Sequence, residues 1–425
     1  MLTLTTILGE LHNYFLPGTS EKYFSDYWER YKREKQKKKT KIEISKRGNG
    51  SKIYILKQDP SVKVIGARMK WIRDDIKIGP QTDNIKIAGL SRTVYPSDSD
   101  NNYLYHPIQF DDEFDALNVL GIVSNVLRMY KNTLKDLGEE EDFHWQWGRI
   151  PLQVYPIAGE EANAHYSRND RALKFFYFMS EGKTIRTGRS FDVVAHEMGH
   201  AILDALRPRW LDSRNPYTKA LHESFGDLTA IFAILDDLDL CDSLVAHSKG
   251  DLHEHSFINI IGEEMGTGLG LRFGLRNADT DRTLRSVSSR MHALAEVFTS
   301  AMYDILADIF DAELEKNHFE EPAIVLHRVG KALFSLFCQA LMKSPQVNAT
   351  FYDMAKLMLS LEKETWKWMI MNQYFRSRQI LDLTISRMHN EQTFRETLKR
   401  SSEADSKSIC KFNQTYLTDL CDANE

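Results

Sequence analysis

Residues 191–204 carry two histidines and a glutamate at a spacing that suits metal chemistry. The sequence FDVVAHEMGHAILD contains His196-Glu197-x-x-His200 among apolar neighbours that are typical of a buried helix. Because residues four apart share one face of a helix, both imidazoles can point at a single ion. Glu197 follows the first histidine, so it can act on a metal-bound water without binding the metal. A core helix that carries two histidines by chance has the same pattern, so this stretch alone leaves both interpretations open.

Residues 220–230, ALHESFGDLTA, supply acids that complete such a site. A catalytic zinc takes three protein ligands and keeps one position for water, and Glu223 is the expected third ligand, on a second helix that returns past the first. Asp227 lies one turn further along the same face, where it can accept a hydrogen bond from the outer nitrogen of a ligating histidine. Its apolar neighbours indicate a buried acid, which needs such a partner. The sequence therefore predicts one Zn²⁺ bound by His196, His200 and Glu223.

These residues resemble the thermolysin-like gluzincin metallopeptidases, whose site pairs HExxH with a downstream Glu-x-x-x-Asp. Three more stretches extend the resemblance over about residues 163–303: NAHY at 163–166, DVVAHE at 192–197, and LRS at 284–286 with His292 behind it. The resemblance implies that Asn163 and Ala164 lie on an edge strand that binds the substrate main chain. It also implies that Arg285 binds a substrate carbonyl and that His292 stabilises the transition state. An ordinary turn asparagine and a structural histidine at a helix start remain the alternatives for Asn163 and His292.

The chain departs from this family in three places. Tyr217 is only a candidate for the tyrosine that assists the oxyanion, and no acid precedes His292 to orient its imidazole. The family binds calcium with acids near the second metal helix, where this chain has the apolar sequence IFAI at 231–234. We therefore expect Asp192 to cap its helix, and we expect no structural calcium.

Length and composition limit the classes of partner. The 425 residues suffice for two or three domains, 42% of them are hydrophobic, and the net charge of −5 implies no polyanionic partner. No apolar run is long enough for a membrane span, and the first residues lack the basic start of a secretory signal peptide. We therefore expect a cytoplasmic protein, or one exported without a recognisable signal peptide. Four scattered cysteines without a CxxC pair indicate reduced thiols, although Cys410 and Cys421 could form a bridge.

Two other polar stretches allow functional interpretations. Residues 32–47 are strongly basic and would suit a nucleic acid or an anionic membrane. No aromatic residue lies among these charges, so we expect a solvated helix end and no nucleic-acid partner. In the loop-rich stretch 238–279, His247, His253 and His255 could form a second metal site, but merely exposed histidines are the simpler interpretation.

Periodicity predicts the elements that position these residues. Short β-like segments at 52–56, 62–65 and 85–88 precede a long amphipathic helix over 111–137. Strands are expected at 152–155 and 173–178, with 163–166 on an edge between them. After the two metal helices, further helices begin at Met291 and cover 323–341 and 352–371, so the C-terminal part is expected to be helical.

We thus predict an α+β fold: a zincin-like two-lobed metallopeptidase with a mixed N-terminal lobe that contains a β-sheet and a helical C-terminal lobe. The expected divisions are an N-terminal extension with the basic run and short strands (1–110), the catalytic lobe (111–240) and the helical lobe (241–425). The predicted function is a zinc-dependent endopeptidase that cleaves peptides or proteins with Glu197 as general base. Two alternatives stay open: an aminopeptidase, although the chain lacks a Gly-x-Met-Glu-Asn motif, and a binding protein that keeps the fold without turnover.

Overall fold

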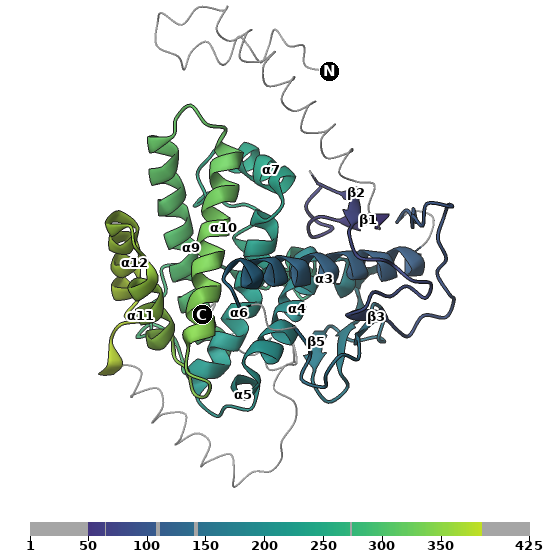
Figure 1. The fold of residues 1–425 in the computed structure, drawn as a ribbon, viewed down its shortest axis with the longest axis horizontal. Coiled ribbons are helices and arrows are strands. Elements are labelled where there is room, and N and C mark those ends of the chain that lie inside the picture. Colours follow the sequence, from purple (N-terminus) through teal and green to yellow (C-terminus); the bar gives the residue numbers. More distant parts are fainter. Residues whose placement is uncertain (1–49, 64, 108–110, 140–142, 273, 385–425) are drawn as a thin grey trace, which may run out of the picture. The chain divides into compact units, whose positions relative to one another are not determined.

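The computed structural model describes residues 50–63, 65–107, 111–139, 143–272 and 274–384, and Figure 1 shows their arrangement. Every described residue belongs to one compact unit, which begins at Gly50. The basic run at 32–47, Cys410 and Cys421 lie outside the described residues. Helices and small β-sheets are mixed within the described part, so the α+β class is confirmed. The divisions at residues 110 and 240 stay predictions.

A four-stranded sheet contacts the helix that carries the HExxH motif. Its strands, in spatial order, are β3 (Ile85–Ile87), β4 (Leu152–Tyr155), β6 (Ala172–Phe175) and β5 (Ala164–Ser167). β3, β4 and β6 are parallel, whereas β5 pairs with β6 in the antiparallel direction. Along β4 and β5, buried side chains alternate with partly exposed ones, because one face of the sheet packs on helices. The prediction of an edge strand at this position is confirmed, since β5 is the last strand of the sheet.

Two-stranded antiparallel ribbons accompany this sheet. They pair β1 (Ser51–Leu56) with β2 (Ala67–Ile72), β7 (Tyr177–Ser180) with β8 (Lys183–Arg186), and β9 (Ile260–Ile261) with β10 (Arg276–Asn277). The predicted strand at 62–65 is wrong, because the Val62 N–H donates to Asp59 and that of Ile65 to Val62 in a turn that connects β1 to β2. The predicted strand at 173–178 is divided at Phe176, where β6 ends and the next ribbon begins.

The helix with the HExxH motif and the helix with Glu223 pack along each other at the centre of the described part. The helical elements of this region are α3 (Asp111–Asp136), the 3₁₀ turn η1 (Thr187–Arg189), α4 (Phe191–Leu206), α5 (Pro208–Leu211) and α6 (Pro216–Leu235). α4 and α6 pack along each other, and α4 also contacts α3 and β5 (Figure 1). α6 begins where the Asn215 side chain accepts a hydrogen bond from the Tyr217 N–H, with Pro216 at the first helical position. The helix predicted at 111–137 is confirmed as α3.

The described C-terminal part is mainly helical, as predicted, but the helix predicted at 352–371 is divided into two at residues 362–364. Its helices are α7 (Leu238–Ser248), the short α8 (Glu263–Gly268), α9 (Met291–Lys316), α10 (Pro322–Lys343), α11 (Phe351–Leu361) and α12 (Thr365–Ser377). By length and composition α10 could cross a membrane, but Phe334 and Phe337 are buried and the helix packs on α7, α9 and α11. That is the packing of a core helix. α9 packs on α6.

Candidate metal centre

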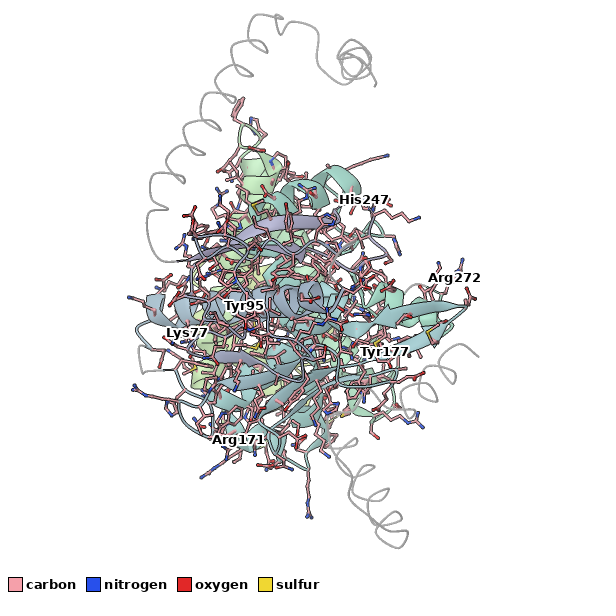
Figure 2. The ribbon with its side chains drawn as sticks, turned by 90° about the vertical axis from the view of Figure 1, so that its right-hand side faces the viewer. Lys77, Tyr95, Arg171, Tyr177, His247 and Arg272 are labelled. Atoms are coloured by element: carbon pink, nitrogen blue, oxygen red, sulfur yellow. The ribbon has the colours of Figure 1, made fainter. Side chains whose placement is uncertain are left out.

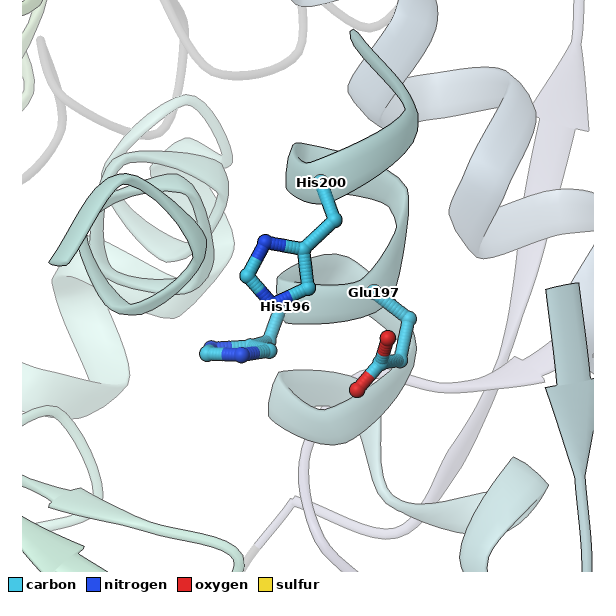
Figure 3. A group of neighbouring side chains, drawn as sticks. All are labelled: His196, Glu197 and His200. Carbon is cyan, nitrogen blue, oxygen red and sulfur yellow. The ribbon is translucent and has the colours of Figure 1, made fainter. Parts of the chain in front are cut away.

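α4 presents the two histidines of the HExxH motif on one side. Figure 3 shows the rings of His196 and His200 side by side along the helix, with Glu197 next to them. All three side chains are buried, and each offers a ligand atom within 4.8 Å of the others. The sequence prediction that both imidazoles share a helical face is therefore confirmed.

Glu223 reaches both histidines from the neighbouring helix α6. Its Oε2 lies 3.7 Å from His196 Nε2, and its Oε1 lies 3.7 Å from His200 Nε2. Around a tetrahedral zinc, bonds of about 2.1 Å place neighbouring donor atoms about 3.4 Å apart. The three residues thus have the donor types and the spacing that suit Zn²⁺, and all three are almost completely buried.

Glycines at the contact between α4 and α6 allow the two helices to pack close together. A Cβ atom at Gly226 of α6 would lie 2.6 Å from the Cε1 and Nδ1 atoms of His196. On α4, a Cβ atom at Gly199 would lie 2.7 Å from Thr229 Oγ1 and 3.2 Å from the Cα atom of Gly226. Either side chain would force the helices apart or displace a ring. The sequence did not predict the role of these glycines, because each one makes its close contact with the other helix.

Asp227 lies behind His196, as the sequence predicted. Its Oδ1 is 2.9 Å from His196 Nδ1, so the imidazole can donate from that nitrogen and keep the lone pair of Nε2 for a metal. Arg276, a buried residue of β10, places its Nη2 2.7 Å from the same carboxylate and its Nη1 3.7 Å from Glu223 Oε2. A guanidinium between two buried carboxylates offsets part of their charge.

His200 has a different neighbour. Its Nδ1 lies 2.8 Å from the Nδ1 of His222, the residue before Glu223 on α6. Burial lowers the pKa of His222 to about 4, and burial together with His196 lowers the pKa of His200 well below its usual value. Both rings are therefore neutral at physiological pH, which is the form of histidine that binds metals.

The pKa values of Glu197 and Glu223 are shifted in opposite directions. Burial, followed by the charge of Glu223, raises the pKa of Glu197 well above its usual value. Burial also raises the pKa of Glu223, but His292, His200 and His196 outweigh it and hold that pKa well below its usual value. Glu223 is thus the permanent anion of the pair, and Glu197 is the carboxylate that can take up a proton.

The edge strand β5 is fixed against α4 through its main chain. The Tyr166 N–H donates to Glu197 Oε2 at 2.8 Å, and the Tyr166 hydroxyl donates to Asp204 at 2.6 Å. Because main-chain directions repeat every two residues in a strand, the N–H and C=O of Ala164 face the same side as those of Tyr166. Asn163 precedes this strand, and among the described residues no hydrogen-bond donor reaches its buried Oδ1. Both residues that the resemblance assigns to substrate binding therefore lie beside the HExxH helix.

The structure brings His292 to the site but not Arg285. His292, in the first turn of α9, places its Nδ1 3.3 Å from Glu223 Oε2 and has 14% of its side chain exposed. Arg285 is 67% exposed and its Nη2 lies 3.7 Å from Asp382, on the surface. The arginine at the site is Arg276 instead. Its signal in the sequence was the Leu275-Arg276 pair, which repeats the Leu-Arg pair at 284–285.

Tyr217 is placed in the core. It is fully buried in the first turn of α6, and its ring packs edge-on against Phe351 with centroids 5.2 Å apart. That contact belongs to the packing of α6 on α11. The structure gives no support for Tyr217 as an oxyanion-binding residue.

Asp192, in the first turn of α4, belongs to a group of acids that the sequence did not reveal. Ser190 is the N-cap residue, so the prediction that Asp192 caps the helix is wrong; Asp192 Oδ2 accepts the Gly262 N–H at 2.8 Å. Carboxylate oxygens of Asp59, Asp192 and Glu263 lie within 4.8 Å of one another. Burial and the neighbouring acids raise the pKa of Asp192 to about 7 and that of Glu263 to about 10. Ca²⁺ binds carboxylate oxygens. We expected no structural calcium because Asp192 had no acidic partner in the sequence, and that reason is wrong.

The loop histidines do not gather. Figure 2 shows His247 at the surface, in the last turn of α7, and His255 is also exposed. His253 Nδ1 lies 3.1 Å from Asp279, and both residues approach Asp304 closely enough to form a candidate metal group. Asp304, however, already accepts the Arg378 guanidinium at 2.6 Å. The three histidines therefore do not form the joint site that the sequence left open.

The assembled centre has side chains that could bind a metal ion. It offers three ligands of the types that zinc prefers, a buried carboxylate beside them and a strand edge next to that carboxylate. The chain matches no known protein-family model and no curated protein sequence.

Proposed function

We propose that this protein is a zinc-dependent endopeptidase of the thermolysin-like gluzincin type. The observation that carries the proposal is the meeting of Glu223 with both imidazoles of the HExxH helix, 3.7 Å from each Nε2. The HExxH pattern alone does not predict a carboxylate from a second helix at this place. Two histidines that merely fill the core would not require such a carboxylate beside both rings. We also propose the zincin-like two-lobed arrangement, with β3–β6, α3 and α4 in one lobe and the helices from α6 to α12 in the other.

His196, His200 and Glu223 would hold the zinc ion. When bound, zinc polarises the scissile carbonyl and lowers the pKa of its water to about 7. Asp227 holds the His196 ring by its Nδ1, and Arg276 stabilises the Asp227 carboxylate. These two residues act through the ligand that they orient.

Glu197 is the proposed general base. The Tyr166 N–H fixes one of its oxygens, so the other can face a water molecule at the metal. Burial and the charge of Glu223 raise the pKa of Glu197, so this carboxylate holds a proton more tightly than an exposed one, as a residue that carries a proton from water to the leaving amine must. Glu197 would take the proton of the attacking water and deliver it to the leaving amine.

The main chain of β5 and the side chains of Asn163 and His292 would position the substrate. An extended peptide can add to the outer edge of β5, where the N–H and C=O of Ala164 face the HExxH helix. The Asn163 side chain would bond to the substrate backbone. His292 beside Glu223 would donate to the oxyanion.

A blocked peptide library tests the reaction class. We expect purified protein with about one zinc per chain to cleave peptides that are acetylated and amidated, because an edge strand binds main chain on both sides of the scissile bond. Cleavage that requires a free N-terminus would reverse the assignment to aminopeptidase. Zinc binding and peptide binding without cleavage would indicate the silent binding protein, and a chain that takes up no zinc would overturn the whole proposal.

A further inference from the structure

We propose that His222 is a positioning residue that holds His200 ready for zinc by accepting a hydrogen bond from it, an inference that rests on the proposed zinc site. The two Nδ1 atoms are 2.8 Å apart, and the ring centroids are 4.7 Å apart with an angle of 31° between the planes. Both side chains are more than nine-tenths buried. Sequence reasoning gave His222 no role.

The contact between two Nδ1 atoms restricts where the protons lie. A neutral imidazole carries one N–H and one lone pair, so one ring must donate from Nδ1 and the other must accept. A ring that donates from Nδ1 keeps the lone pair of Nε2. His200 Nε2 faces Glu223 at 3.7 Å, on the side where the metal would lie. His200 is therefore a ligand only when it is the donor and His222 is the acceptor.

The opposite arrangement excludes zinc from this ligand. If His222 donates, the proton of His200 stays on Nε2 and blocks its lone pair. The change between the two arrangements moves the bridging proton from His222 to His200 and the Nε2 proton from His200 to His222. The pair keeps two protons in both, so it releases none when the metal binds.

The second ligating histidine is held in a different way. The Asp227 carboxylate can only accept, so its contact of 2.9 Å favours the proton of His196 on Nδ1, a nitrogen that Arg276 Nη2 also approaches to 3.1 Å. An imidazole can accept or donate, so His222 stabilises the ligating form of His200 without forcing it. Among the described residues, no hydrogen-bond partner reaches His222 Nε2, which is buried. This nitrogen is the one that must carry the proton in the zinc-bound form.

Three variants test the role by zinc affinity, measured by competition with a chromophoric chelator. His222→Leu removes the acceptor and should weaken zinc binding about 10- to 100-fold, the usual loss when the partner of a ligating histidine is removed. His222→Asn should stay within about threefold of wild type, because the asparagine Oδ1 lies about as far from Cβ as the histidine Nδ1 does. His327→Leu, on α10 and away from the site, is the control for loss of a half-buried histidine and should not change the affinity.

The unmodified protein gives a second measurement, which does not depend on whether a variant folds. Nitrogen-15 NMR of the zinc-loaded protein should show His222 protonated on Nε2 and unprotonated on Nδ1. A His222 proton on Nδ1, or wild-type zinc affinity in His222→Leu, would overturn the inference. Zinc binding with these properties but without peptide cleavage would support the inference and defeat the proposed function, whereas a chain that binds no zinc would defeat both.

Discussion

Gly226 provides the most direct test that His196 is a ligand in the orientation described. A Cβ atom at this position would lie 2.6 Å from His196 Cε1 and Nδ1 and 2.8 Å from Nε2. Carbon atoms in ordinary contact are about 3.5–4.0 Å apart, so in Gly226→Ala the ring must retreat by about 1 Å. The hydrogen bond of 2.9 Å to Asp227 opposes that movement. The helices must therefore separate, or the imidazole must leave its place.

The two costs of Gly226→Ala can be separated. Overpacking of a core costs about 1–3 kcal/mol, and alanine returns up to about 1 kcal/mol through its higher helix propensity, so the net loss of stability is about 0–3 kcal/mol. Metal sites tolerate changes in ligand distance of only about 0.2 Å. A shift of about 1 Å in His196 should therefore weaken zinc binding by about 100-fold or more.

Gly330→Ala is the matched control. A Cβ atom at Gly330 of α10 would lie 2.8 Å from the Cβ atom of Leu235, so this variant crowds α6 to a similar extent without touching a ligand. Urea unfolding of the zinc-free proteins should give similar losses for both variants, and chelator competition should show weakened zinc only in Gly226→Ala. Wild-type zinc affinity in Gly226→Ala would show that His196 does not bind the metal in this orientation.

Other residues give further tests. Glu197→Gln should keep zinc and lose about 100-fold or more of the peptidase rate, whereas Glu223→Gln should weaken zinc itself; a normal rate in Glu197→Gln would remove it as the base. Arg276→Ala should destabilise the protein by about 3–5 kcal/mol, because it leaves buried carboxylates unpaired. Arg285→Ala, at an exposed arginine, should change stability by less than about 0.5 kcal/mol. Thermal unfolding of the two variants measures this difference. The pKa of Asp192 is raised to about 7 in the folded protein, so folding favours its protonated form. Its contribution to the free energy of unfolding is complete below about pH 4 and is lost as the pH rises to about 7. The total loss is at most about 4 kcal/mol. Unfolding measured across this range with a calcium-selective chelator should show the loss, and Asp192→Asn should reduce it; a rise in the midpoint on adding calcium would show that the acids bind a cation.

The parts of the centre that lie within one helix could be predicted from the sequence. The spacing from His196 to His200 and from Glu223 to Asp227 is four residues in each case, and helix geometry alone places both members of a pair on one face. The two helical pairs needed only local periodicity. The edge strand at 163–166 was expected from the resemblance to the gluzincin family, and the order of the strands confirms it.

The parts that join distant segments could not be predicted in this way. Arg276 reaches Asp227 from β10, 49 residues further along the chain, and a nearby Leu-Arg pair competed for the same role. Asp59 meets Asp192 across more than 130 residues, so the acid partner was missed when only residues near the second metal helix were considered. Such contacts depend on how whole elements pack, and no periodicity of the sequence records them.

The charge of the buried centre gives an independent argument for a divalent cation. Glu197, Glu223 and Asp227 are three buried carboxylates, and Arg276 is the buried cation that contacts two of them. With all four ionised and the histidines neutral, the group carries a charge of about −2, which is costly in a protein interior. The raised pKa of Glu197 is one response, because a proton on this carboxylate reduces the charge. A divalent ion between the two imidazoles and Glu223 would balance the charge and allow Glu197 to ionise, and only an ionised Glu197 can accept a proton from water.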